Sequence, residues 1–548
     1  MGPVSDETTF AALIAARADD EHAALWFEER CWTWREVVTE ASRRAAIIEA
    51  ELGDGLGDGL GDGPAQGPRH VGLGLANSAE HLFWWLGAAV CGAAVVGINP
   101  TRRGAELARD ITFTGCRMLV LDDSLVDVLA GVEHDVPEHR VLHVDTSAYA
   151  ERLARTHPAP LPAEPVDPAA VLSLIFTSGT TSAPKAVICT QRRMGRIAEQ
   201  QVERRGLTAD DTFYVVMPMF HSNAIMAGIA PAVCTGGTIV LRSRFSASAW
   251  LPDVRRHGVT FFNYVGKPLN FILATPERPD DADNPLRIAF GNEAAERDIA
   301  EFARRFGCTV IDSFGSSEGE IRILRTPDTP TGSLGRAPEG TVVVDPETLE
   351  ECPPARFDAD GRLLNAEEAT GEIVNKTGAA LFEGYWDNPE ADAARLRHGW
   401  VWSGDLAYRD AEGFFYFAGR TGDWLRVDGE NIATAPIERL LMRFPAFAGV
   451  AVVAVPDDTA GDQVLAVVEL VDGRDLEPGS FGDFLAAQPD LGTKWAPRWV
   501  KVVDALPRTP SNKIVKRAVD TAVHPHAGRT VLAREGSSLN YAPLRPAP

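Results

Sequence analysis

The residues best suited to chemistry occur first in a loop between two apolar runs. Residues 171–176 are mainly apolar, hydroxyl groups and glycine follow up to Pro184-Lys185, and a second apolar run ends near Cys189. This order predicts strand, polar loop, strand. Small residues let a backbone approach a polyanion, their N–H groups and hydroxyls can share one concavity, and Lys185 adds a point charge. The segment is a candidate phosphate-binding loop, although a Ser/Thr-rich surface turn has the same composition. It is not a Walker loop, because Gly-Lys-Ser/Thr is absent.

Three later apolar runs also end in polar or glycine residues. Residues 211–217 lead into 218–223, with His221, and residues 287–290 lead into 291–293. Residues 309–313 lead into a Phe-Gly-Ser-Ser-Glu-Gly segment at 314–319. Ligands of α/β proteins bind at the carboxyl ends of strands, so these segments are candidate parts of one site.

The elements that position these segments follow an α/β rhythm. From residue 71, short apolar strands alternate with helical patterns, which predicts parallel strands covered by helices. Beyond residue 333 the sequence changes to β-rich hairpins with Gly/Pro/Asp turns, and a compact α+β pattern follows Arg420-Thr421-Gly422-Asp423. We therefore predict a large N-terminal domain of several subdomains over residues 1–419, with parallel-rich sheets and a β-rich subdomain. A small α+β C-terminal domain follows over 424–548, and 420–423 is the boundary.

Composition narrows the class of protein. The chain has 548 residues and a net charge of −24, which argues against general nucleic-acid binding. Its seven cysteines lack Cys-x-x-Cys spacing, so a zinc site or disulfide framework is not expected and a reducing cytoplasm fits.

Residues 82–98 are almost wholly apolar, but glycines interrupt them and no basic clusters flank them. We interpret them as a buried helix near 79–91 and a buried strand near 93–98, not as a transmembrane segment. The oligomeric state stays open, with a homodimer as one option.

The loop at 177–185 closely resembles the phosphate loop of the acyl-adenylate-forming enzymes, which include acyl-CoA synthetases, peptide-synthetase adenylation domains and luciferases. Six further motifs follow in that family's order, and the resemblance covers roughly residues 10–520. They are Pro218–Asn223, Gly291–Glu293, Phe314–Glu318, Trp402–Asp405, Gly419-Arg420 through Gly429–Ile432, and Arg508–Lys513. Tyr264–Lys267 and Gly429-Glu430-Asn431 look most like the fatty-acid-transport-protein or very-long-chain branch of acyl-CoA synthetases.

The resemblance implies an ATP site. It places the β- and γ-phosphates on Thr177, Ser178, Gly179, Thr180, Thr181 and Lys185, and magnesium on Glu318 and Thr180. The nucleoside site would include Gly291, Asn292, Glu293, Ser313, Phe314, Gly315 and Ser317, with Phe314 against adenine. Asp405 would accept hydrogen bonds from the ribose hydroxyls, and Arg420 would bond the ribose from across the site. An oxygen ligand such as Glu318 suits a hard cation.

The resemblance also implies two half-reactions. A carboxylic acid attacks ATP, pyrophosphate leaves, and coenzyme A then displaces AMP. Lys513 would bridge the carboxylate and the α-phosphate, and His221 would flank the acyl site. Residues 420–423 would be the hinge of a mobile C-terminal domain, after which Gly429 would line the pantetheine tunnel. Ser182 and Asn512 depart from the family, which usually has glycine at both places; asparagine tolerates left-handed backbone.

Three functions remain open from sequence. The first is an acyl-CoA synthetase acting on a small-molecule acid with ATP, Mg²⁺ and coenzyme A. The second is an adenylating ligase with another acid or acceptor, such as a nitrite-activating diazotase acting on an arylamine, or an amide ligase. The third is a non-catalytic adenylate-binding protein, which the joint presence of Lys185, Glu318, Asp405, Arg420 and Lys513 disfavours. The motifs do not size the acyl pocket, which we expect along 219–226, 264–269 and 315–322.

Overall fold

The chain forms two compact units. The computed structural model describes residues 8–53, 68–100, 104–177, 185–326, 328–359, 361–420, 424–427, 430–457, 461–488, 491, 494–508, 514–523, 530–536 and 538–544. The first unit comprises residues 1–312 and 382–392, and the second comprises 313–381 and 393–548. The chain therefore passes between units inside strand β13 (Thr309–Gly315), before Phe382, and inside helix α13 (Pro389–Arg395).

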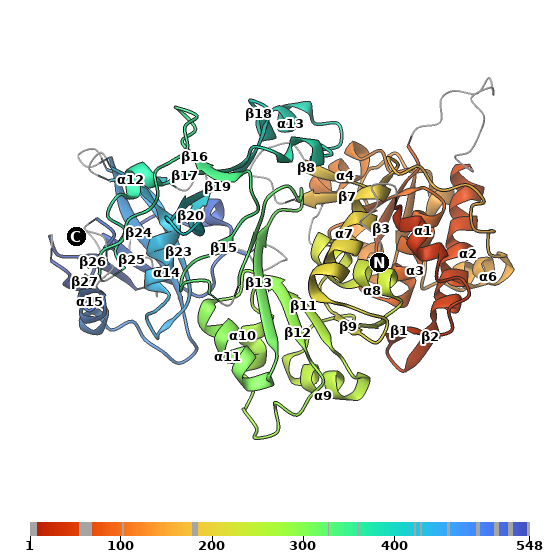
Figure 1. Ribbon diagram of the computed structural model, residues 1–548, viewed down its shortest axis with the longest axis horizontal. Helices are drawn as coiled ribbons and strands as arrows, with labels where there is room; N and C mark the ends of the chain where they lie inside the picture. Colours follow the sequence, from red (N-terminus) through yellow and green to blue (C-terminus); the bar gives the residue numbers. More distant parts are fainter. Residues whose placement is uncertain are drawn as a thin grey trace. The chain divides into compact units, whose positions relative to one another are not determined.

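One sheet of the first unit carries the candidate phosphate loop. Its strand order is β6-β5-β3-β4-β7-β8, parallel except for the antiparallel β7–β8 pair. The strands are β3 (His70–Gly74), β4 (Ala94–Gly97), β5 (Met118–Leu121), β6 (Val141–His143), β7 (Val171–Thr177) and β8 (Lys185–Thr190). Their associated helices are α2 (Trp34–Leu52), α3 (Ala79–Val90), α4 (Gly104–Phe113), α5 (Asp123–Leu129), η1 (Glu138–Arg140) and α6 (Ser147–Arg155). Figure 1 shows α2 and α3 side by side.

A second sheet of this unit runs β13-β12-β11-β9-β10-β1-β2. Its strands besides β13 are β1 (Ala23–Phe27), β2 (Arg30–Thr33), β9 (Thr212–Val215), β10 (Thr238–Leu241), β11 (Phe261–Val265) and β12 (Ile288–Asn292). The remaining helices of the unit are α1 (Phe10–Ala15), α7 (Gln191–Arg205), the π-helix η2 (Ala224–Ile229), α8 (Ala230–Thr235), α9 (Ala247–His257), α10 (Pro268–Leu273) and α11 (Glu296–Phe306). The pairs β10–β9, β9–β11 and β11–β12 are all parallel, as the α/β rhythm predicts.

The apolar segment at 82–98 is a buried helix and strand, which confirms the prediction. All of α3 except Glu80 is buried, and the side chain of Ser78 caps it by accepting from the N–H of His81. A Cβ at Gly87 would lie 2.6 Å from the carbonyl oxygen of Ala41, so this glycine lets α3 pack closely on α2. Among the described helices, none combines the length and hydropathy needed to span a bilayer.

The second unit begins with an antiparallel β-rich part. Strand order along it is β16-β17-β19-β20-β15-β14-β13, and β18 pairs with β19. The strands are β14 (Arg322–Leu324), β15 (Gly335–Arg336), β16 (Thr341–Val344), β17 (Gly371–Asn375), β18 (Leu396–Arg397), β19 (Trp400–Arg409) and β20 (Phe414–Arg420), with α12 (Ala366–Ala369) and η3 (Gly378–Leu381) between them. This part corresponds to the hairpin-rich region that the sequence predicts.

The C-terminal part of the second unit has its own sheet and core. The strands are β21 (Trp424–Val427), β22 (Glu430–Ala433), β23 (Phe447–Asp457), β24 (Gly461–Leu470), β25 (Trp499–Val503), β26 (Val531–Arg534) and β27 (Tyr541–Pro543), with α14 (Thr434–Leu441), α15 (Pro478–Ala486) and η4 (Lys516–Ala518). The tail beyond residue 523 forms β26, which pairs with β25, and β27, which pairs with β26. Buried Tyr541 anchors it by donating to the carbonyl of Pro497.

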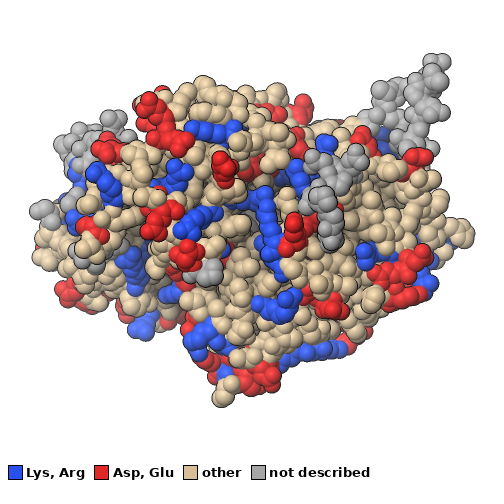
Figure 2. Space-filling model, viewed as in Figure 1, with Lys and Arg blue, Asp and Glu red and all other residues tan. Residues whose placement is uncertain are grey.

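The fold prediction of a mixed α/β protein with a β-rich subdomain and an α+β C-terminal part is therefore confirmed. On the face drawn in Figure 2, acidic and basic side chains are interspersed.

Candidate active site

The candidate phosphate loop closes an antiparallel hairpin. Thr177 at the end of β7 is the register partner of Lys185 at the start of β8. The residues between them, with the predicted ligands Ser178, Gly179, Thr180 and Thr181 and the departure Ser182, lie outside the described part of the chain. The strands on both sides thus place Lys185 at the base of the loop, as the strand–loop–strand prediction requires.

Residues 383–386 brace this hairpin from its other edge. The N–H of Ile188 donates to the carbonyl of Gly384, and the N–H of Trp386 donates to that of Ala186. Glu383 accepts from both the hydroxyl and the N–H of Thr190, at 2.6 and 2.9 Å. The Lys185 ammonium lies 5.8 Å from the centroid of the Tyr385 ring. Backbone pairing on two sides therefore fixes the strand from which Lys185 extends.

Cys189 on β8 is not a candidate nucleophile. Complete burial raises the pKa of its thiol to about 12, so the group stays protonated and unreactive near neutral pH.

The segment 218–223 is held at the carboxyl end of β4. Asn77, which is buried, accepts from the N–H of Met219 and donates to the carbonyl of Met217, both at 2.9 Å. A Cβ at Gly97 would lie 2.9 Å from the carbonyl oxygen of Phe220, so the segment needs a glycine there to approach the strand. His221, predicted to flank the acyl site, sits in this segment between β9 and the π-helix η2.

The same segment is tied to the end of β11. Asn223 donates to the carbonyl of Tyr264 at 3.3 Å and accepts from the amide of buried Asn263 at 2.7 Å. The π-helix η2 begins immediately after Asn223 and contains Ala224, Met226 and Gly228. Single π-turns often mark functional sites, and small or flexible apolar side chains suit the wall of an apolar pocket.

In the predicted adenine segment 291–293, Gly291 and Asn292 are the last residues of strand β12, and Glu293 follows the strand. A Cβ at Gly291 would lie 2.6 Å from the ring of Tyr264, so only glycine fits beneath this tyrosine. The carboxylate of Asp312 accepts from the Tyr264 hydroxyl at 2.9 Å and from the N–H of Ala294 at 3.1 Å. Glu293 has a φ of 67°, a left-handed conformation that is uncommon outside glycine. Asp312 thus fixes both the tyrosine and the turn after β12.

In the second unit, Ser313, Phe314 and Gly315 lie in the antiparallel β13–β14 pair. The ring of Phe314 lies 5.9 Å from that of Phe417. The turn after β13 contains Ser317 and Glu318, and the Glu318 carboxylate is largely buried. An ion pair of 3.7 Å joins Glu318 to Arg395. Sequence reasoning missed this arginine.

Asp405 and Arg420, both predicted to bond the ribose, are register partners in the antiparallel β19–β20 pair. Before Asp405 the strand contains Gly404, whose φ is 74° and whose N–H donates to Glu372 at 2.7 Å. The Ser403 hydroxyl accepts from the N–H of Asp405 at 2.9 Å. The structure therefore brings these two predicted residues to one place on the sheet, with the Asp405 backbone held by its neighbours.

Lys513 and Gly429 lie outside the described residues, as do the hinge positions 421–423 and Asn512. The ends of the Lys513 segment are described. Arg508 pairs with Ile514 in an isolated bridge, and the guanidinium of Arg508 bonds Glu469 on β24 at 3.0 Å. Lys516 donates to Thr434 at 2.6 Å and pairs with Glu438 on α14 at 2.9 Å. Both ends of the segment are therefore anchored in the C-terminal part.

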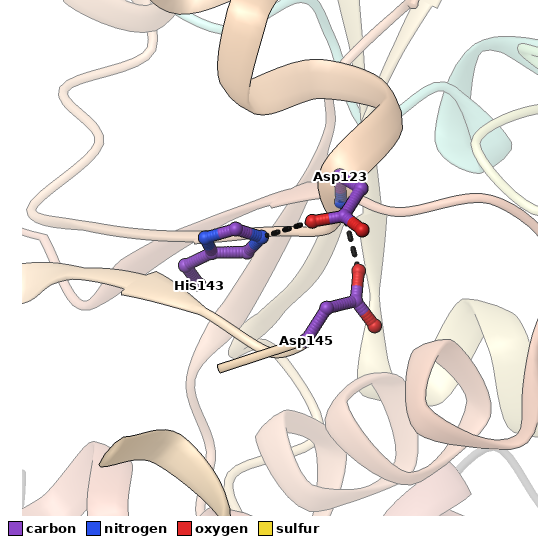
Figure 3. Close-up of side chains that lie close together, drawn as sticks. All are labelled: Asp123, His143 and Asp145. Atoms are coloured by element: carbon purple, nitrogen blue, oxygen red, sulfur yellow. Dashed lines mark hydrogen bonds and ion pairs between the residues drawn. The ribbon is translucent and has the colours of Figure 1, made fainter. Parts of the chain in front are cut away.

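Asp123, His143 and Asp145 also lie close together, at the ends of β5 and β6 (Figure 3). Within the described ranges they are the one group of three such side chains near enough to share a metal ion. Asp145 accepts from the N–H of Asp123 at 2.8 Å, and His143 contacts the Asp123 carboxylate at 2.7 Å. Both aspartates are exposed, and Asp145 has a structural role because it satisfies the N–H of Asp123, the first residue of α5.

Comparison with known proteins decides the family. The AMP-binding enzyme profile matches residues 13–386, and the AMP-binding enzyme C-terminal domain profile matches residues 436–513. The chain belongs to the AMP-binding enzyme family. The resemblance inferred from the motifs is confirmed.

Relatives and solved structures agree with this assignment. A steroid-22-oyl-CoA synthetase of Rhodococcus jostii is 48% identical over 94% of this chain and 91% of its own length. A medium/long-chain-fatty-acid–CoA ligase, FadD17, of Mycobacterium marinum is 44% identical over 94% and 96%. Human long-chain fatty acid transport protein 5 is 30% identical over 88% and 73%. ATP-bound MatB of Rhodopseudomonas palustris shares the fold, with a TM-score of 0.78 at 23% identity over 94% and 98%.

The prediction of an acid–CoA ligase that works through an acyl-adenylate is confirmed by these relatives. The chain is an enzyme of that class, and ATP and coenzyme A are its co-substrates.

Proposed function

We propose that this enzyme activates a large apolar carboxylic acid, of the medium- to long-chain fatty acid or steroid side-chain class, and transfers it to coenzyme A. The observation that carries the proposal is the 44–48% identity, over 94% of the chain, with ligases named for such acids. The apolar residues of η2 and the buried Tyr264 beside it support a hydrophobic acid site.

In the first half-reaction an oxygen of the acid attacks the α-phosphorus of ATP and pyrophosphate leaves. The two reactants are anions, so positioning and charge neutralisation supply most of the catalysis. We assign the β- and γ-phosphates to the loop ending at Lys185, the ribose to Asp405 and Arg420, and adenine to Phe314 and the 291–293 segment. Lys513 neutralises charge on the carboxylate and the α-phosphate, and His221 flanks the acid.

Magnesium fits the residues in the second unit. Glu318 and Glu320 are both largely buried, and one guanidinium, Arg395, lies 3.7 and 3.9 Å from their carboxylates. Two carboxylates with one cation leave net negative charge on oxygen atoms, the donor type that magnesium prefers. When bound, the ion neutralises phosphate charge. We assign Glu318 as a ligand, and Thr180 remains the proposed second ligand.

In the second half-reaction the thiol of coenzyme A attacks the acyl carbon and AMP leaves. Lys513 and the Gly429 segment serve different steps at one nucleotide, so we propose that the domain over 424–548 turns about 420–423 between them. Fixing φ with Gly422→Pro then suppresses one half-reaction and spares the other, when adenylate formation and thiol transfer are assayed separately.

The seven free cysteines favour a reducing compartment, for which we propose the cytoplasm.

A substrate panel tests the proposal. Purified enzyme is assayed for acid-dependent pyrophosphate release, with and without coenzyme A, on a steroid C22 acid, palmitate, octanoate, acetate, benzoate and nitrite. The proposal expects the highest kcat/KM for a large apolar acid, and a coenzyme A thioester of that acid by mass spectrometry. Preference for acetate or nitrite would overturn the acid class. Release of pyrophosphate without a thioester would favour a different acceptor, and ATP binding without turnover of any acid would favour a sensor.

A further inference from the structure

One arginine of the second unit contacts both the turn that contains Glu318, the predicted magnesium ligand, and the strand that contains Asp405, the predicted ribose ligand. Arg395 is the last residue of α13, and its side chain is nine-tenths buried. One terminal nitrogen, Nη1, donates to the carbonyl of Ser403 at 2.6 Å, and the other, Nη2, donates to the hydroxyl of Ser316 at 3.1 Å. The guanidinium therefore joins the turn after β13 to strand β19.

The same nitrogen that bonds Ser316 also faces two carboxylates. Nη2 lies 3.7 Å from the Glu318 carboxylate and 3.9 Å from that of Glu320, whose side chain is fully buried. These separations are longer than a direct charge-assisted hydrogen bond, whereas both oxygen contacts to the serines are within hydrogen-bond distance. Arg395 thus supplies positive charge to both acids while its geometry is set by Ser316 and Ser403.

On the β19 side the contact reaches Asp405 through one residue. Ser403, whose carbonyl accepts from Arg395, uses its hydroxyl to accept from the N–H of Asp405 at 2.9 Å. A displacement of Ser403 therefore moves the Asp405 backbone. Since Ser316 precedes Glu318 by two residues in one turn, a displacement there moves Glu318 in the same way.

Resting on the proposed function, we propose that Arg395 is a positioning residue that sets Glu318 for magnesium and Asp405 for the ribose at the same time. Glu320 keeps the guanidinium paired when the ion engages Glu318, so the arginine does not have to leave. The planar guanidinium is suited to this, because its fork presents several donors in fixed directions, which an ammonium cannot.

Calorimetric titration of the full-length protein tests the proposal without turnover. Kd is measured for ATP in EDTA and for ATP with Mg²⁺, in wild type, Arg395→Met and Arg395→Lys. The expected result for Arg395→Met is a rise of about tenfold or more in Kd for Mg·ATP, since truncating one partner of a buried charge network leaves the others unpaired. The Kd ratio, defined as Kd for ATP in EDTA divided by Kd for Mg·ATP, also falls in this variant. Arg395→Lys, which keeps the charge but not the fork, falls between wild type and Arg395→Met.

Arg409→Met is the matched control. Arg409 lies on the same strand as Asp405 and pairs with Glu351 at 3.4 Å, and its removal is expected to leave both Kd values unchanged. A purely structural role for Arg395 would lower the binding stoichiometry and the Tm while the Kd ratio stayed at the wild-type value, and that result overturns the proposal. If Arg395→Met does not fold, a wild-type Kd ratio in Arg395→Lys overturns it instead. Absence of acid-dependent pyrophosphate release by wild type would count against the proposed function, whatever the Kd values.

Discussion

Two predicted functional segments, one in each unit, are held by different means. In the first unit, the hairpin β7–β8 is fixed by backbone pairing within itself and to residues 384–386. In the second unit, the side chain of Arg395 joins the turn with Glu318 to the strand with Asp405, and the Glu372 side chain accepts from the N–H of Gly404 on that strand. Backbone pairing tolerates side-chain changes, whereas a buried charge network does not. Single substitutions in the second-unit segments should therefore have larger functional effects than single substitutions in the hairpin β7–β8.

The largest effect is expected from Lys513, in the second unit. Lys513→Ala should lower acid-dependent pyrophosphate release about 10²–10³-fold, because a charge-assisted contact made mainly in the transition state is lost. Thiolysis of a supplied acyl-adenylate should be largely retained. The assay compares both rates in the variant and in Lys376→Ala, which removes a lysine paired with Glu351. A Lys513→Ala enzyme that adenylates at the wild-type rate would exclude Lys513 as the bridging lysine.

A pH effect of comparable size is expected in the first unit, on stability and not on chemistry. Complete burial lowers the pKa of His81 to about 4 from its ordinary 6.5, so the unfolded chain takes up this proton first as the pH falls. The contribution of neutral His81 to the free energy of unfolding is fully present above about pH 6.5. About 3 kcal/mol of that free energy is lost by about pH 4. Urea titrations at pH 7.5 and 5 check this, with His81→Gln as the comparison. An equal loss of stability in His81→Gln would show that another group is responsible.

The next effect concerns the ribose. Asp405→Ala should weaken ATP binding by roughly 1–3 kcal/mol, because a buried hydroxyl pair loses its acceptor. Asp405→Asn, which keeps one acceptor oxygen, should lose less. Fluorescence or calorimetric titration with ATP measures both, and wild-type affinity in Asp405→Ala would place the ribose elsewhere.

The smallest effect is expected in the braced hairpin. Thr190→Val removes the hydroxyl bond to Glu383 and the N-cap of α7, yet it leaves the backbone bonds of Ile188 and Trp386 in place. Stability should fall by about 1 kcal/mol, while Kd for ATP stays within about threefold of wild type. A loss of ATP affinity as large as that of Asp405→Ala would contradict this contrast between the hairpin β7–β8 and the second-unit segments.

The contrast also explains what the sequence could predict. The hairpin around Lys185, the buried α3–β4 segment and the order of motifs follow from local pattern, since each depends on neighbouring residues. Arg395 could not be predicted in this way, because its partners Ser316 and Glu318 lie 77–79 positions away in the chain. Asn77 and Asp312 were missed for the same reason: their bonds to Met219 and Tyr264 span 142 and 48 positions. The paired tail strands β26 and β27 also depend on a distant edge, that of β25.

The acyl-adenylate step is tested most directly by following oxygen from the acid. The acid is labelled with ¹⁸O in its carboxylate and incubated with ATP, Mg²⁺ and coenzyme A, and the AMP product is weighed by mass spectrometry. Attack of a carboxylate oxygen on the α-phosphorus, followed by thiol attack on the acyl carbon, leaves one acid oxygen on AMP. The expected products are therefore AMP carrying one ¹⁸O and a thioester carrying the other. Unlabelled AMP, or ADP and phosphate as products, would contradict an acyl-adenylate intermediate.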